Sequence, residues 1–321
     1  MNLWDKLPRP FFVLAPMADV TDPAYRRLIA ETAMPDVMWT EFVSADGLYH
    51  TREKKGMKDA ENPLMRDLQF STGEHPIVAQ FFTSSPEMME YAARLALTLG
   101  FDGVDINMGC PDRSIEKQGA GAAHIKDPER AKEVIRGALR GTEGKIPVSV
   151  KTRLGYNKME YQQWLPQILS EDISALTIHM RTRKEMSNVP AHYELAEDIV
   201  SVCRNANPNV LLIANGDVTD IADAREKATT YGFDGVMLGR AIFGNPWLFS
   251  GRLHSELSRE ERIQALLVLA RHFTELSPSK HYAILKKHFK AFISGWDGAG
   301  ELRSRLMQTN SLTELEEVLQ K

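Results

Sequence analysis

Eight short apolar runs recur along the first three quarters of the chain, and they constrain its fold more than any other feature. The stretches between them have helical patterns, and Ser84–Gly100, Asp127–Gly141 and Asp220–Gly232 each end near a glycine of the kind that closes helices. The runs are apolar throughout, as expected for parallel strands buried on both faces. They are FFVLA (11–15), VMWT (37–40), IVAQFF (77–82), GVDIN (103–107), PVSVKTR (147–153), ALTIH (175–179), VLLIAN (210–215) and GVMLG (235–239). Eight strand–helix units within about 250 residues predict an α/β fold, the (β/α)8 TIM barrel.

Beyond the last apolar run only helical periodicity remains. Two serine–glutamate pairs have the spacing of a capping box, and each predicts the start of a helix. They are Ser258 with Glu261 and Ser311 with Glu314. We therefore expect two domains, a barrel over residues 1–247 and a small all-helical domain over residues 248–321.

Composition excludes several classes of protein. Hydrophobic residues make up 43% and charged residues 26% of the 321 residues, which is typical of a soluble globular chain. The N-terminal segment has neither a long apolar stretch nor a cationic region before one, so we expect a cytoplasmic protein with no membrane partner. The two cysteines, Cys110 and Cys203, form no CxxC motif, which predicts no metal site. The net charge of -4 gives no global sign of a nucleic-acid binder, and a monomer is expected.

The segment from Asp105 to Lys126, DINMGCPDRSIEKQGAGAAHIK, invites comparison with a phosphate-binding loop because it contains a Gly-Ala-Gly run near a lysine. Counting on from Gly119 places His124 where a P-loop or a dinucleotide fingerprint requires glycine. The segment is therefore predicted to be a loop with another role, in which Gly119 and Gly121 supply flexible backbone.

Polar residues follow or end nearly every apolar run. In a barrel the carboxyl ends of the strands meet at one rim, where active sites of this fold are built. They are Pro16 with Met17, Glu41, Gln80, Asn107 with Cys110, Lys151 with Arg153, His179 with Arg181, Asn215-Gly216-Asp217, and Gly239-Arg240. These residues can instead simply start loops, but a Gln, a Lys and a His within apolar strands would each then need a buried partner. The set favours a functional rim.

The turns after the seventh and eighth runs, ANGD and GRA, lie where barrels frequently bind phosphate. Arg240 adds a cation with a fork geometry suited to phosphate, although two tight turns with a surface arginine would look the same. Lys151 and His179 can face an electron-rich ring and stabilise its anionic reduced form. Flavin mononucleotide (FMN) fits one phosphate and one planar head better than a dinucleotide does.

Taken together, LAPMADVTD, Gln80, DINMGCPDRSIEKQGAGAA, VKTRLG, IHMRTR, ANGDV and MLGRAIFGNPW resemble the tRNA-dihydrouridine synthase family, over about Val13 to Trp247. The resemblance implies an enzyme that uses FMN, with NADPH as reductant, to reduce a uridine in tRNA to 5,6-dihydrouridine. It also implies cofactor contacts and a proton donor, Cys110. The implied cofactor residues are Pro16, Met17, Ala18, Gln80, Asn107, Lys151, His179, Asn215, Gly216, Asp217, Gly239 and Arg240.

Cys110 suits this chemistry without the resemblance. Hydride transfer from flavin N5 to C6 of uracil leaves an enolate, so C5 must receive a proton from a group that is protonated at neutral pH. An ordinary cysteine, with a pKa of about 8.5, meets that condition. The alternative role is a small buried hydrophobe, as we expect for Cys203, but Gly109 and Pro111 place Cys110 in a loop.

Contacts with RNA are expected from arginines near the rim and from a basic stretch, Lys280 to Arg305, in the helical domain. A solvated helix face and surface ion pairs are the ordinary alternatives. The candidates are Asn107, Arg153, Arg181, Arg183, Lys286, Lys287 and Arg303.

Three features depart from the family pattern, namely Met180, the pair Ala123-His124 and the loop Lys184–Glu194. They lie in loops that can meet RNA, so the sequence leaves open which uridine is reduced. No nicotinamide fingerprint is visible, so NADPH is not distinguished from NADH. Two other functions stay open: an FMN-dependent barrel reductase of a small molecule, and a non-catalytic RNA-binding relative.

Overall fold

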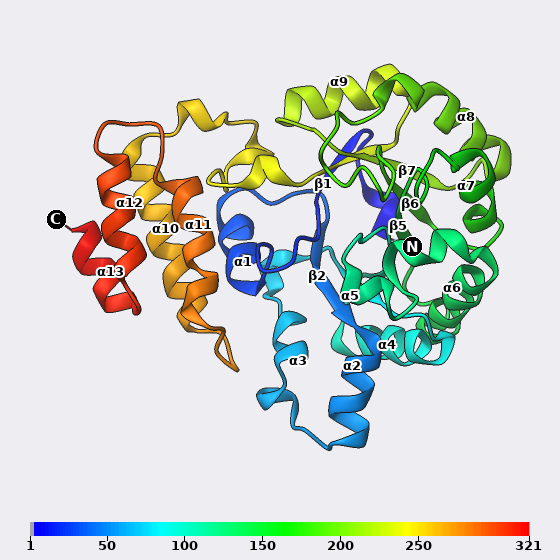
Figure 1. Ribbon diagram of the computed structural model, residues 1–321, viewed down its shortest axis with the longest axis horizontal. Helices are drawn as coiled ribbons and strands as arrows, with labels where there is room; N and C mark the ends of the chain where they lie inside the picture. The colour runs from blue at the N-terminus through cyan, green and yellow to red at the C-terminus, as the bar shows by residue number, and fades with distance from the viewer. Residues whose placement is uncertain (1–2, 321) are drawn as a thin grey trace.

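The computed structural model describes residues 3–320 and contains one parallel sheet of eight strands (Figure 1). From β2 to β8 each strand pairs with the next along the chain, and β1 pairs with β8. Between β1 and β2 the barrel closes at Val13 and Val37, where the Leu14 N–H donates to the Val37 carbonyl at 3.3 Å. The strands are β1 (Phe11–Leu14), β2 (Met38–Ser44), β3 (Ile77–Phe82), β4 (Gly103–Met108), β5 (Val148–Arg153), β6 (Ala175–His179), β7 (Leu211–Asn215) and β8 (Gly235–Leu238). The predicted (β/α)8 barrel is confirmed.

The second strand departs from its predicted bounds by several residues, whereas the other strands agree with theirs to within one residue. The sequence predicts residues 37–40, whereas β2 continues to Ser44 after an irregularity between Trp39 and Phe42. Glu41 therefore lies inside a strand, and it is buried. The apolar run stops at Glu41 because that side chain is charged, and its buried partner comes from a distant part of the chain.

Helices cover the outside of the barrel, and α6 and α9 begin after Asp127 and Asp220, as the sequence predicts. The side chains of Asp22, Ser85, Asp127 and Asp220 accept hydrogen bonds from backbone N–H groups in the first turns of α1, α4, α6 and α9. The barrel helices are α1 (Pro23–Thr32), α2 (Ala45–Tyr49), α3 (Pro63–Asp67), α4 (Pro86–Leu99), α5 (Arg113–Glu116), α6 (Pro128–Thr142), α7 (Tyr161–Leu169), α8 (Ala196–Ala206) and α9 (Ile221–Tyr231).

Gly141 does not close its helix, contrary to the prediction. It lies within α6, where an added Cβ would come within 2.4 Å of the Glu90 carbonyl oxygen on α4. This glycine is required for close approach of two helices, and the left-handed residue that ends α6 is Glu143.

The C-terminal helices lie side by side at one flank of the barrel (Figure 1). They are α10 (Arg259–Thr274), α11 (Lys286–Phe292), α12 (Ala299–Gln308) and α13 (Leu312–Leu319). Ser258 and Glu261 form the predicted capping box, while Ser311 caps α13 alone because the Glu314 carboxylate accepts instead from the Asn310 N–H at 2.7 Å.

Aromatic packing joins this helical part to the barrel. The Tyr25 ring on α1 lies 4.8 Å from the His288 ring and 6.2 Å from the Phe292 ring, centroid to centroid. Both partners are buried on α11. Among residues 3–320, no helix is long and apolar enough to cross a membrane.

Candidate active site

A cavity of about 640 Å³ opens at the carboxyl ends of β1, β5, β6, β7 and β8. This is the rim at which barrels carry ligand sites. Its lining residues are Ala15, Pro16, Met17, Lys151, His179, Ser187, Asn215, Gly216, Asp217, Val218, Thr219, Met237, Gly239, Arg240 and Ala241. The cavity thus brings together nine of the predicted cofactor residues. The other three, Ala18, Gln80 and Asn107, lie outside its lining.

The strand register places the polar residues of the cavity on neighbouring strands. His179 of β6 is paired in register with Asn215 of β7, and Lys151 comes from β5. The Lys151 Nζ donates to Asn215 Oδ1 at 2.9 Å, and Asn215 Nδ2 donates to the Met237 carbonyl at 2.9 Å. One amide therefore fixes the position of the ammonium group.

Burial and neighbouring cations set the protonation of these two bases. Burial and, to a lesser degree, the nearby Arg153 guanidinium lower the pKa of Lys151 to about 7, while Asp105 acts in the opposite direction. Burial, together with Arg153 and Lys151, holds the pKa of His179 well below its usual range, so the imidazole is neutral. Its Nδ1 is buried without a hydrogen-bond partner in the described part of the chain. Such a group is available for a ligand.

The opposite wall of the cavity is made by the turns after β7 and β8. Gly216 has φ +120°, and Asp217 is left-handed at φ +44°. The Asp217 carboxylate accepts from Arg240 at 2.5 Å, from the Ala191 N–H at 2.9 Å and from Arg181. The hydrogen bond from Arg181 is the main reason that the pKa of Asp217 is lowered. Asp217 therefore acts as an anchor for Arg240, whose side chain is 62% exposed.

A chain of buried side chains runs beneath the Cys110 loop. Gln80 Nε2 donates to Asp105 Oδ2 at 2.6 Å, and Asn107 Nδ2 donates to Gln80 Oε1 at 3.1 Å. Asn107 Oδ1 in turn accepts from the backbone N–H of Cys110 at 2.9 Å. Because Asp105 only accepts, it orients the Gln80 amide and, through it, the Asn107 amide. The predicted residues Gln80 and Asn107 are thus held below the surface and support the cysteine.

Asp105 is the residue that sequence reasoning missed. It is fully buried on β4, accepts a second hydrogen bond from Ser149 at 2.5 Å, and has its pKa raised by burial to about 6. A charged residue between Val104 and Ile106 in a buried strand was the available signal, since such a residue requires partners.

The Cys110 thiol is half-buried, and burial raises its pKa, so it is protonated at neutral pH. Cys203 is buried in α8, as expected. Gly121, which the sequence predicts to supply flexible backbone, lies in a closely packed part of the loop. It is buried at φ +60°, and an added Cβ would lie 2.8 Å from the Cys110 carbonyl oxygen. That oxygen accepts from the Ala122 N–H at 3.0 Å, so the glycine holds the loop tightly.

The predicted RNA-contacting arginines of the rim are engaged with protein groups. Arg153 donates to the Gly109 carbonyl at 2.7 Å and to the Met186 carbonyl at 2.9 Å, which ties the Cys110 loop to the loop after β6. Arg181 is buried, and Arg183 pairs with Glu116 of α5. These contacts order the loops around the site.

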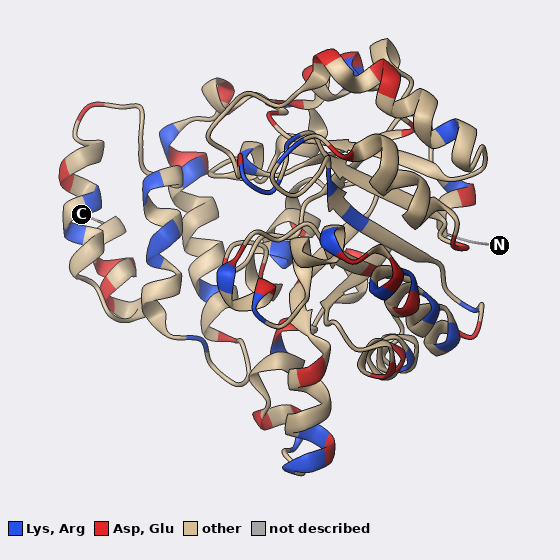
Figure 2. Cartoon of the chain, turned by 45° about the vertical axis from the view of Figure 1, so that its right-hand side comes forward, with Lys and Arg blue, Asp and Glu red and all other residues tan. Residues whose placement is uncertain are grey.

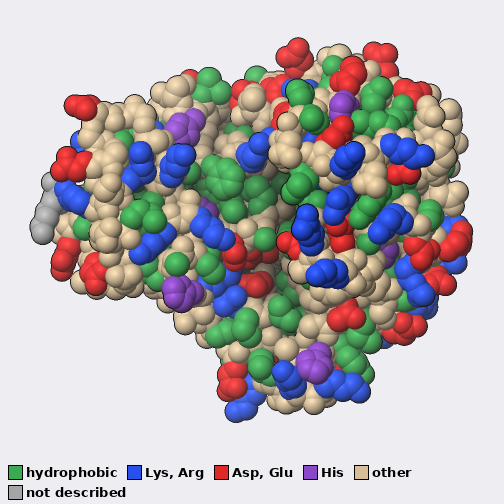
Figure 3. Space-filling view, in the orientation of Figure 1, with side chains coloured by type: hydrophobic (Ala, Val, Ile, Leu, Met, Phe, Trp, Pro, Cys, Tyr) green, Lys and Arg blue, Asp and Glu red, His purple; other side chains and the backbone are tan. Residues whose placement is uncertain are grey.

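In the helical part, Lys286 and Arg303 line a shallow groove together with Lys290. Lys287 lies apart from them and pairs with Asp19 of the barrel at 2.7 Å. Lys and Arg are frequent on these helices in the turned view (Figure 2). On the face seen in Figure 3, Lys and Arg side chains lie on both the helical part and the barrel, with hydrophobic side chains gathered between them.

Two histidines at positions that depart from the family pattern are held by neighbouring polar groups. His124 is buried and its Nε2 lies 2.9 Å from the Thr83 carbonyl oxygen. His192, in the atypical loop 184–194, lies between Glu185 and Glu194 at 3.0 and 2.6 Å. Among residues 3–320, no group of three or more His, Cys, Asp or Glu side chains is arranged to hold a metal ion.

Comparison with known families matches residues 13–321 to the model described as dihydrouridine synthase (Dus). A probable tRNA-dihydrouridine synthase from Staphylococcus epidermidis is 41% identical over 99% of this chain and 95% of its own length. Probable tRNA-dihydrouridine synthase 2 from Bacillus subtilis is 40% identical, with 99% and 95% covered.

Among solved structures, morphinone reductase matches with a TM-score of 0.52 and 13% identity, covering 78% of this chain and 87% of that one. A 2-naphthoyl-CoA reductase matches with a TM-score of 0.58 and 10% identity, covering 75% and 49%. At this identity the likeness extends to the fold.

Proposed function

The chain belongs to the dihydrouridine synthase family, so it is an oxidoreductase acting on the C5–C6 bond of uridine in tRNA, and we propose how its residues carry out that reaction. The proposal assigns the cavity at β5 to β8 to FMN and the Cys110 loop to proton delivery. The two sites are adjacent because Asn107, beneath Cys110, is paired in register with Lys151 of the cavity.

The residues of the cavity fit a flavin phosphate and ring. Gly216 and Gly239 leave backbone close to the cavity, and Arg240 stands at its edge with an exposed guanidinium anchored by Asp217. We assign these residues to the phosphate. Lys151 and the unpartnered Nδ1 of His179 are assigned to the ring. When bound, FMN supplies the hydride for C6 of uracil, and we propose NADPH as the reductant that renews it.

The pKa of Lys151 is about 7, so its side chain can take up a proton when the anionic reduced flavin is bound. The resulting ammonium group stabilises that anion. His179 is neutral and can donate or accept one hydrogen bond without adding charge. Cys110 keeps its proton at neutral pH and gives it to C5 of the uracil. The Asp105–Gln80–Asn107 chain holds the Cys110 backbone during this transfer.

We assign the groove of Lys286, Lys290 and Arg303 to the phosphate backbone of tRNA. A cationic groove on the helical part, lined by residues other than those of the cavity, suits a large substrate that must present one turned-out base. A small-molecule substrate would not need it. A tRNA substrate also supports the expected cytoplasmic location.

This groove is testable. Changing Lys286, Lys290 and Arg303 together to Ala should raise KM for tRNA at least tenfold at 0.15 M salt and flatten its salt dependence, because each lost phosphate contact lowers the slope by about one. FMN content should stay unchanged. Deletion of residues 248–321 is a poorer test, because it would expose the buried face of Tyr25 on α1. An unchanged KM for tRNA in the triple variant would remove this groove from tRNA binding.

One observation supports the proposal most strongly. The loop that carries Cys110, whose thiol is protonated, lies beside a cavity lined by Lys151, His179 and Arg240. The proposal is tested by mapping dihydrouridine, position by position, in tRNA from cells with and without this protein. We expect one or a few positions to lose dihydrouridine. An unchanged map would contradict the proposal, and purified protein without flavin absorbance would favour a non-catalytic RNA-binding relative.

A further inference from the structure

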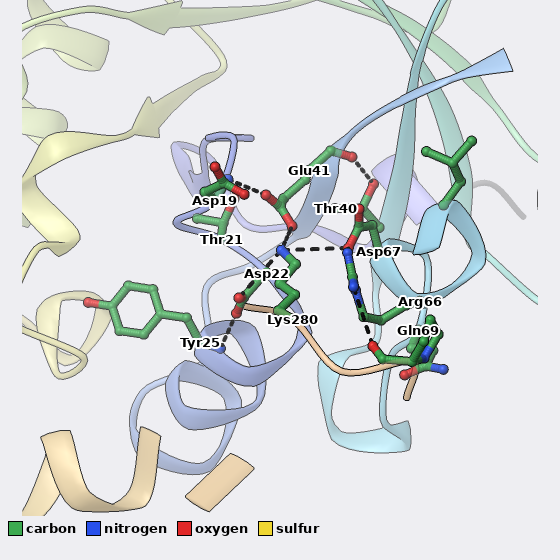
Figure 4. A network of polar contacts seen from close by, with 12 residues as sticks. Asp19, Thr21, Asp22, Tyr25, Thr40, Glu41, Arg66, Asp67, Gln69 and Lys280 are labelled. Atoms are coloured by element: carbon green, nitrogen blue, oxygen red, sulfur yellow. Dashed lines mark hydrogen bonds and ion pairs between the residues drawn. The ribbon is translucent and has the colours of Figure 1, made fainter. Parts of the chain in front are cut away.

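Lys280 lies in the connection between α10 and α11, and its ammonium group is enclosed by three carboxylates of the barrel (Figure 4). Its Nζ is 2.9 Å from Glu41 Oε2, and 3.5 Å from both Asp22 Oδ2 and Asp67 Oδ1. The Lys280 side chain is 3% exposed. It therefore cannot meet RNA, although it belongs to the basic stretch that the sequence suggested for that role.

Glu41 passes this contact on to the loop after β1. One of its oxygens binds Lys280, and the other accepts a hydrogen bond from the backbone N–H of Asp19. Asp19 is a non-glycine residue in the left-handed region at φ +53°, a conformation that requires support from its surroundings. Lys287, also from the helical part, binds the Asp19 carboxylate at 2.7 Å.

The loop that Asp19 shapes is part of the cavity wall. Pro16 and Met17 line the cavity, and the turn closes on itself through the Met17 N–H, which donates to Thr21 Oγ1 at 2.9 Å. The Val20 N–H donates to the Met17 carbonyl at 3.1 Å. Moving the Asp19 peptide therefore moves the residues that face the cavity.

We propose that Lys280 is a positioning residue, which acts through Glu41 and the Asp19 peptide to hold the loop Pro16–Thr21 against the flavin. The proposal rests on the assignment of the cavity to FMN. It makes the helical part a contributor to cofactor retention as well as a surface for RNA. Without Lys280, the three carboxylates would lose the cation that they share, although Arg66 would still pair with Asp67, so Glu41 would turn away or take up a proton.

The test uses the full-length holoprotein and two readouts. Hydrogen–deuterium exchange reports on the peptide that contains Met17–Thr21, and recovery of flavin fluorescence on dilution reports FMN release. We expect Lys280→Met to increase the rates of loop exchange and of FMN release about tenfold. In Lys280→Arg both rates should return most of the way to their wild-type values. Glu31→Gln is the matched control, because it weakens another contact between helical part and barrel, Glu31 with His272 at 2.8 Å, that does not touch the loop.

Loop exchange in Lys280→Met equal to that of the wild type and of Glu31→Gln would overturn the proposal. Faster loop exchange with unchanged FMN release would overturn the link to the cofactor. If Lys280→Met does not fold, Glu41→Gln gives the same two readouts, with faster loop exchange expected and wild-type exchange contradicting the proposal. If the wild-type protein takes up no FMN, the proposed function fails, while the loop exchange still decides whether Lys280 positions the loop.

Discussion

The two halves of the barrel rim use their polar residues in opposite ways. At β5 to β8, Lys151, His179 and Arg240 line an open cavity, and the Nδ1 atom of His179 has no hydrogen-bond partner within residues 3–320. At β3 and β4, the polar groups of Gln80 and Asn107 are buried and bind one another, and the chain ends at the backbone of Cys110. One half is ready to receive a ligand, and the other holds a single thiol in place.

This difference teaches that polar residues at strand ends are not one class. A buried amide needs partners wherever it lies, and it becomes part of the support when the protein supplies them. A cation anchored on one side only, like Arg240 on Asp217, is left to bind something else. Variants in each half should therefore fail in different measurements.

The largest change in affinity for FMN is expected from Arg240→Met in the open half of the rim. Losing a charge-assisted contact to phosphate should raise the Kd for FMN by about tenfold to a hundredfold, from a loss of roughly 1.5–3 kcal/mol. Saturating FMN should restore turnover, as measured by flavin titration and steady-state rates. Arg225→Met is the control. Arg225 lies in α9, outside the cavity lining, and its guanidinium stacks over the ring of Phe12 in β1. Equal affinities in both variants would remove Arg240 from the cofactor site.

A smaller effect is expected from Asp105→Leu in the closed half. It removes the acceptor of Gln80 Nε2, at a cost of roughly 1–3 kcal/mol, and leaves Ser149 Oγ with only its longer contact to the Val104 carbonyl at 3.4 Å. We expect tRNA reduction to slow about tenfold with the Kd for FMN unchanged, and Asp105→Asn to recover most of the rate. Weaker FMN binding with normal reduction would contradict the division of the rim.

The smallest effect concerns the stability of the cofactor-free protein. Lys151 releases its proton near pH 7 when folded, whereas an unfolded lysine keeps it until about pH 10.4. The unfolded state binds more protons between these values, so this group makes the free energy of unfolding rise with pH. Lys151→Met should raise Tm by roughly a few degrees at pH 6, and the gap should narrow toward pH 10. A gap that does not change with pH would show that Lys151 is not buried as a charge.

The barrel was predictable because each apolar run by itself predicts a strand that is buried on both faces. The exceptions have causes that lie elsewhere in the chain. Glu41 interrupts the second run because its partner, Lys280, is more than two hundred residues away. Gly141 resembles a helix-ending glycine in the sequence. Its actual role, close packing against the Glu90 carbonyl on α4, depends on a helix that is distant in the chain.

The site was predictable in part for the same reason. Glycine and arginine in the turns after β7 and β8 predicted part of the cavity lining, and its loop position distinguished Cys110 from Cys203. Which side chains face the cavity and which support others depends on pairing between strands, so Gln80 and Asn107 could not be separated from Lys151 by sequence. The charge of Asp105 within an apolar run signalled a need for partners, but strand pairing decides which partners it has.

The central claim is that Cys110 delivers the proton while the open half holds the cofactor. It is tested most directly by single-turnover kinetics on Cys110→Ala, with Cys203→Ala as the control. We expect reduction of the bound flavin by NADPH to be unchanged and its reoxidation by tRNA to slow at least a hundredfold, as for loss of a general acid. Reoxidation by tRNA at the wild-type rate would contradict the account.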